Sequence, residues 1–69
     1  MTNKLGREMV ARRNELALQV ETGELTESEA IQSLAGWLLK RDDFPPGQLT
    51  HGQTRQENAL LNAQTAFAE

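Results

Sequence analysis

The side chains that could carry out chemistry are few and scattered along the chain. The single histidine, His51, sits between threonine and glycine, so a nucleophile and an orienting group within its reach are not expected, and a solvated loop histidine is favoured. The adjacent Asp42 and Asp43 do not converge as the spaced ligands of a calcium loop do, and solvation at a helix end is favoured for them. Cysteine is absent, which excludes disulfides and thiolate metal sites. No phosphate-binding loop or metalloprotease motif occurs either. The sequence predicts no enzyme activity, no metal and no cofactor.

The spacing of apolar residues predicts an all-helical fold. In the first of three expected helices, over residues 3–21, one stripe collects Leu5, Met9, Leu16 and Val20. A second helix is expected over 27–41 and a third, weaker one over 54–67. The expected single domain comprises a helical hairpin (1–41), a linker (42–53) and a C-terminal helix (54–69).

The clearest local signals lie between the first two helices. Gly23 favours the left-handed conformation that closes a helix. Thr26 and Glu29 have the spacing of a capping box, in which each side chain bonds the other residue's backbone N–H. So short a connection predicts an antiparallel hairpin.

The second helix predicts a homodimer. Its apolar arc covers roughly 200° of the helix, about twice the usual stripe, and one neighbouring helix cannot cover it. With no disulfide or metal to stabilise a chain of 69 residues, a second subunit is expected. The expected interface consists of Leu34, Leu38 and Trp37. In the alternative, the third helix covers the arc within one chain.

The charge distribution indicates a protein partner. A net charge of −3, with both signs interspersed, argues against direct nucleic-acid binding. The first helix begins basic, and the following turn is acidic, which suits a basic partner surface such as a DNA-binding regulator. The candidate partner-binding residues are Arg13, Leu18, Glu24 and Trp37.

Each of these candidates also has a simpler interpretation. Arg13 falls within the apolar stripe, where its stem could cover the core while its charge reaches water, which is the favoured reading. Leu18 could be an ordinary exposed leucine and Glu24 a solvated acid. Trp37 could anchor the core as well as an interface.

The segment Thr22-Gly23-Glu24-Leu25-Thr26-Glu27-Ser28-Glu29-Ala30 looks like the turn of many small helical hairpins. In size and organisation the chain resembles small phage-encoded host-takeover proteins, notably the quorum-sensing anti-activator of some temperate phages. This resemblance carries over no functional residue. It implies a compact, dimeric inhibitor of a bacterial transcription regulator.

The expected function is therefore inhibition or modulation of a partner by direct contact. The alternatives are an antitoxin-like module and a small DNA-binding regulator, although the acidic start of the second helix would be repelled by phosphates. No apolar run reaches the roughly 18 residues that span a bilayer, and no secretory signal is recognised, so a cytoplasmic location is expected.

Overall fold

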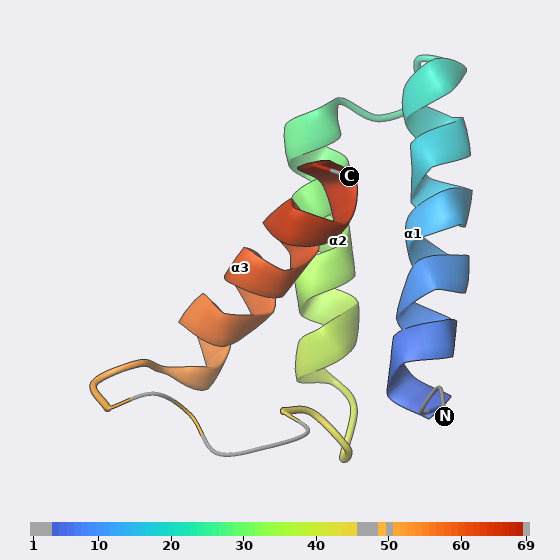
Figure 1. The fold of residues 1–69 in the computed structure, drawn as a ribbon. Helices are drawn as coiled ribbons and strands as arrows, with labels where there is room; N and C mark the ends of the chain where they lie inside the picture. Colours follow the sequence, from blue (N-terminus) through green and yellow to red (C-terminus); the bar gives the residue numbers. More distant parts are fainter. Residues whose placement is uncertain (1–3, 46–48, 50, 69) are drawn as a thin grey trace.

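The fold is built from helices packed on one another. The computed structural model describes residues 4–45, 49 and 51–68, and within them the regular elements are α1 (Lys4–Glu21), α2 (Glu27–Leu39) and α3 (Arg55–Ala68), with no strand (Figure 1). The all-helical class is confirmed. Helix α2 ends at Leu39 rather than at residue 41, because the backbone N–H groups of Lys40 and Arg41 bond three residues back, to Trp37 and Leu38. Such bonds tighten the last turn and end the helix.

The connection between α1 and α2 uses two capping motifs. Gly23 has a φ of 86°, and its N–H bonds the Val20 carbonyl while the Glu24 N–H bonds the Gln19 carbonyl, which is the pattern of a Schellman motif. At the start of α2, the Glu29 N–H donates to Thr26 Oγ1 at 3.1 Å and the Thr26 N–H donates to Glu29 Oε1 at 2.9 Å. The predicted capping box is confirmed. Within five residues the chain reverses direction, and α2 returns alongside α1 (Figure 1).

Helix α2 is the centre of the molecule. It packs against both α1 and α3, whereas α1 and α3 contact each other least (Figure 1). All three helices and the segment after α2 contribute to the buried core, which consists of Leu5, Leu16, Ala30, Leu34, Ala35, Leu38, Phe44, Ala59 and Ala63. The small alanines of α3 let it approach α2 closely. The apolar arc of α2 is therefore covered from two sides within one chain.

This packing encloses two residues of the predicted dimer interface. Leu34 and Leu38 both have an exposed fraction of 0% in the single chain, so neither side chain is available to a second subunit in this fold. The intrachain alternative, in which the third helix covers the arc, is what the structure has. Trp37 is partly buried and packs against the same core.

The segment between α2 and α3 is more than a linker. Phe44 is buried in the core, although it lies in the predicted linker. Arg55, the first residue of α3, donates from Nε to the Phe44 carbonyl at 3.0 Å and from Nη2 to the Arg41 carbonyl at 2.7 Å. Its guanidinium also lies 5.9 Å from the centre of the Phe44 ring. Arg55 thereby ties the start of α3 to the end of α2.

Candidate functional site

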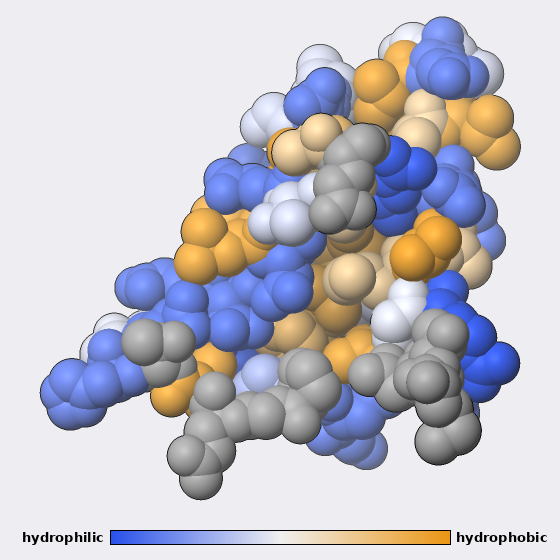
Figure 2. Space-filling model, viewed as in Figure 1, coloured by the Kyte–Doolittle hydropathy of each residue, from blue (hydrophilic) through white to orange (hydrophobic). Residues whose placement is uncertain are grey.

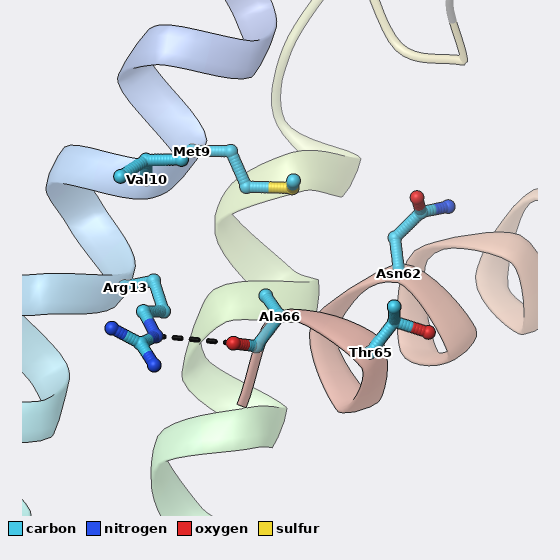
Figure 3. Close-up of a pocket in the computed structure, with 6 residues that line it drawn as sticks. All are labelled: Met9, Val10, Arg13, Asn62, Thr65 and Ala66. Carbon is cyan, nitrogen blue, oxygen red and sulfur yellow. Dashed lines mark hydrogen bonds between the residues drawn. The ribbon is translucent and has the colours of Figure 1, made fainter. Parts of the chain in front are cut away.

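A groove separates α1 from α3 on one face of the molecule. Because both helices pack on α2 and little on each other, their facing sides stay apart and enclose a cavity of about 380 Å³. Its lining, which we call the α1–α3 groove, consists of Met9, Val10, Arg13, Asn62, Thr65 and Ala66 (Figure 3). Figure 2 shows apolar surface gathered in this gap. The volume lies within the range of known ligand sites, although towards its lower end.

Arg13 bridges the two walls of the groove. Its Nε donates to the Ala66 carbonyl at 3.1 Å (Figure 3), and its Nη1 donates to Asn14 Oδ1 at 2.8 Å. The guanidinium lies 5.8 Å from the centre of the Phe67 ring. The Ala66 carbonyl belongs to the last turn of α3, where carbonyls have no partner within the helix and a cation is favourable. Arg13 thus holds the C-terminal end of α3 against α1.

Polar side chains follow the α3 wall of the groove. Asn62 Nδ2 donates to the Asn58 carbonyl at 2.8 Å and to Asn58 Oδ1 at 2.9 Å, and Asn58 Nδ2 donates to Gln53 Oε1 at 3.0 Å. These bonds orient the Asn62 amide so that its oxygen lies on the groove side (Figure 3). Together with the Thr65 hydroxyl, this oxygen gives the α3 wall hydrogen-bonding capacity beside the apolar Met9 and Val10.

Apolar side chains are exposed on both sides of the groove. Val10 on α1 is 55% exposed and Leu61 on α3 is 52% exposed. Leu61 immediately precedes Asn62 and lies one helical turn before Thr65, so it borders the groove on its outer side. Residues 58–68 of α3 include no charged side chain. We call Val10, Leu61 and the groove between them the docking face.

The structure separates the four residues predicted to bind a partner. Only Arg13 lines the groove, where it is bonded within the chain. Leu18 is 61% exposed on α1 and Glu24 is exposed in the turn before α2, and neither lines the groove. Trp37 is stacked under Arg41, whose guanidinium lies 4.8 Å from the ring centre. Val10, Leu61, Asn62 and Thr65 were missed, because only the packing of α1 and α3 on α2 shows which of their sides face each other.

Arg41 forms a second cluster of charged residues that sequence reasoning also missed. Its Nη1 donates to Glu8 Oε1 at 2.8 Å, and its Nε and Nη2 donate to the two carboxylate oxygens of Asp43 at 2.8 and 2.9 Å. These hydrogen bonds lower the pKa of both carboxyl groups and raise the pKa of Arg41. With each charge paired across α1 and the end of α2, the cluster is suited to holding the fold together.

The described residues show no arrangement of acid, base and nucleophile at the groove. Within 4–45, 49 and 51–68, no group of three or more histidine, cysteine, aspartate or glutamate side chains is placed to hold a metal ion. In the same residues, no helix combines the length and apolar character needed to cross a membrane.

No protein-family model, curated protein or solved structure matches the chain. The groove's geometry suits binding of an apolar group framed by hydrogen bonds.

Proposed function

We propose that this chain is a non-catalytic protein that binds another protein through the docking face and modulates it by contact. The observation that carries the proposal is the pair of exposed apolar side chains, Val10 and Leu61, on either side of a groove whose α3 wall has no charge. The centres of protein interfaces are depleted of charged residues, and apolar surface rimmed by polar groups marks interaction sites.

The sequence-based proposal of a homodimer needs a different surface. Leu34 and Leu38 are enclosed by their own chain, so the helical hairpin of residues 1–41 cannot associate through them without opening. A second copy would instead have to meet an exposed apolar residue such as Leu18, Val10 or Leu61. The proposal that the partner is a bacterial transcription regulator depends on the acidic turn, where Glu24 and Glu27 are exposed.

Affinity capture from the native host, read by mass spectrometry, tests the proposed function. The full chain is compared with three variants, Val10→Glu, Leu61→Glu and Leu18→Glu, each of which places one charge at an exposed position of a helix. We expect one or more host proteins to be captured by the wild-type chain and lost with the first two variants, because a charge at the centre of an interface must be desolvated. Leu18→Glu, on another side of α1, is the matched control and should retain the partner.

Three outcomes would count against the proposal or a part of it. Loss of capture with Leu18→Glu alone would show that the partner binds around Leu18 rather than at the docking face. Capture that no variant affects would contradict the proposal. Recovery of nucleic acid alone, bound tightly at low salt and released steeply as salt rises, would favour the DNA-binding alternative.

A further inference from the structure

We propose that one face of α1 pairs, antiparallel, with the same face of a second copy of this chain. The face consists of Arg7, Val10, Asn14, Leu18 and Glu21, and we call it the outer face of α1. The inference goes beyond the proposed function, because it concerns association of the chain with itself. Three features support it: the exposure of this face, the symmetry of its side chains about Asn14 and the charges towards its two ends.

The outer face is the side of α1 that the fold leaves uncovered. All of its residues are exposed, and the exposed fractions of Val10 and Leu18 are 55% and 61%. At 3.6 residues per turn, Asn14 lies about 160–180° around the helix from Leu5 and Leu16, the buried residues of α1. Both α2 and α3 lie to one side of α1, so no described helix covers its outer side (Figure 1). Burial of these two large apolar side chains is left to another molecule.

The side chains of the outer face are placed symmetrically about Asn14. Val10 and Leu18 are its neighbours at four residues before and after, about 40° to either side of it around the helix. Arg7 and Glu21 lie about two turns before and after it, about 20° to either side. A two-fold axis at Asn14 therefore sets Val10 level with Leu18 of the second copy. The same axis sets Arg7 level with Glu21 of the second copy. A two-fold interface has this property, since residue i contacts residue j while j contacts i.

Antiparallel pairing buries each exposed apolar side chain of α1 against another one. Val10 of one copy meets Leu18 of the other, and the symmetry makes this contact twice. Ala11 and Ala17 are also equidistant from Asn14 and flank these contacts. Their small side chains allow the two helices to approach closely, because the distance between packed helices depends on the side chains at the contact.

Two asparagine side chains meet at the axis. Asn14 Oδ1 accepts from Arg13 Nη1 at 2.8 Å, and an amide oxygen has a second lone pair. That lone pair can accept a hydrogen bond from the Asn14 amide of the second copy. A pair of asparagines within an interface between helices is known to specify their register. Asn14 thus favours the register that the apolar contacts require.

The charges of the outer face select the antiparallel orientation. Arg7 and Glu21 are opposite in charge, and neither has an ion pair with another described residue. Antiparallel pairing sets each Arg7 beside Glu21 of the other copy, whereas parallel pairing would set like charges together. Beyond Glu21 the chain continues into the acidic turn, where Glu24 is exposed, and the exposed Lys4 precedes Arg7. Each end of the antiparallel pair therefore combines a basic segment with an acidic one.

The size of this interface predicts a weak dimer. One helix from each chain is expected to bury less than the roughly 1,200 Å² at which standard protein interfaces begin, so the dimer should form only as the concentration rises. Val10 belongs both to the outer face and to the docking face. A partner bound at the docking face and a second copy would therefore compete for Val10.

Sedimentation equilibrium of the purified full chain tests the association. Between about 10 μM and about 1 mM, we expect the average mass to rise from the 7.7 kDa of one chain towards that of two. Leu18→Glu should weaken the association by about tenfold or more, because a charge then has to be desolvated in the apolar contact. Gln19→Glu, the same change of charge at an exposed position on the other side of α1, is the matched control and should leave it unchanged.

Two results of this experiment would overturn the inference. One is the mass of a single chain at every concentration. The other is an equal effect of Leu18→Glu and Gln19→Glu, which would place the association on another surface.

Charge reversal tests the register. Arg7→Glu and Glu21→Arg should each weaken the association by about fivefold, because either change sets like charges together at both ends of the pair. The double variant restores opposite charges and should associate as the wild-type chain does. The two single variants, when mixed, should pair with each other in preference to themselves. A double variant as weak as the single ones would contradict the pairing of Arg7 with Glu21.

Nuclear magnetic resonance locates the interface on the folded chain. Backbone amide shifts that change with concentration should concentrate at Val10, Asn14 and Leu18, and shifts confined to α3 would overturn the inference. All of these measurements use the purified chain without a host protein. A chain that stays monomeric but captures a host protein through the docking face would leave the proposed function standing and refute this inference alone.

Discussion

Each aromatic side chain of this protein lies under an arginine. The guanidinium groups of Arg41, Arg13 and Arg55 lie 4.8, 5.8 and 5.9 Å from the ring centres of Trp37, Phe67 and Phe44, respectively. Each arginine also bonds a carbonyl or carboxylate of another segment. Arginine suits this role because its planar group stacks on a ring while its edge donates several hydrogen bonds. In a chain with so small a core, these residues act as connectors between helices.

The Arg41 cluster predicts how stability depends on pH. Hydrogen bonds from Arg41 hold the pKa of Glu8 and of Asp43 below their ordinary values of 4.5 and 3.8. The unfolded chain therefore binds these protons at a higher pH than the folded chain does. The stabilising effect is fully present above the unfolded values and is lost as the pH falls through the folded ones. Urea unfolding followed between about pH 7 and pH 3 should show stability falling in the acid range.

Arg41→Gln should reduce that pH dependence, because it removes the partner of both carboxylates. Lys40→Gln is the matched control: it removes the same charge from the neighbouring exposed residue, which has no ion pair among the described contacts. An acid slope as steep in Arg41→Gln as in the wild-type chain would contradict this account.

At the scale of elements, local hydrogen bonds decide where helices begin and end. The Thr26 and Glu29 pair starts α2, and Gly23, with its positive φ, closes α1. Thr54 plays a similar part for α3, since its Oγ1 accepts from the Glu57 N–H at 3.0 Å. These interactions involve residues close in the chain, so a short sequence is enough to specify them.

Removing the cap of α2 should destabilise the protein. Thr26→Ala leaves the Glu29 N–H without its acceptor and should lower the free energy of unfolding by about 1 kcal/mol. Thr26→Ser keeps the accepting oxygen, so its free energy of unfolding should stay close to that of the wild-type chain. Ser28→Ala, an exposed change in the same turn, is the control and should cost nothing, since alanine favours a helix. Equal stability of Thr26→Ala and wild type in urea unfolding would contradict the role of the cap.

At the scale of the whole molecule, α2 is the element on which the other two converge. Its apolar arc is too wide for one neighbour, and the chain covers it with α1, α3 and Phe44. Because α1 and α3 use different sides of α2, they stay apart from each other, and the groove is a consequence of that divergence. The arrangement that completes the core therefore also creates the candidate binding site.

Leu34 tests whether this core belongs to a single chain. Leu34→Ala should lower the free energy of unfolding by about 2–5 kcal/mol, because it opens a cavity at a side chain that is fully buried. Leu34→Met conserves volume and should cost less than about 1.5 kcal/mol. Sedimentation equilibrium should give the folded Leu34→Met variant the same average mass as the wild-type chain at equal concentration. A lower mass for the variant would indicate that Leu34 contributes to an interface between subunits.

Local patterns in the sequence determined the helical class, the turn and the cap. The capping box of Thr26 and Glu29 and the left-handed Gly23 could be predicted because their partners lie within a few residues along the chain. The stripe of α1 was predictable for a similar reason, since helical periodicity relates residues three and four apart. Arg13 could be singled out as a charge within that stripe, although its partner on α3 could not.

Only the tertiary structure decided what covers α2 and where a groove remains. An apolar arc shows that a surface must be buried and leaves open whether another helix or another subunit buries it. Bringing α3 onto α2 enclosed Leu34 and Leu38, joined Arg13 to Ala66 and left Val10 exposed among the residues that line the groove. Arg13 and Ala66 lie 53 residues apart, so their contact depends on the packing of whole helices, which no local spacing encodes.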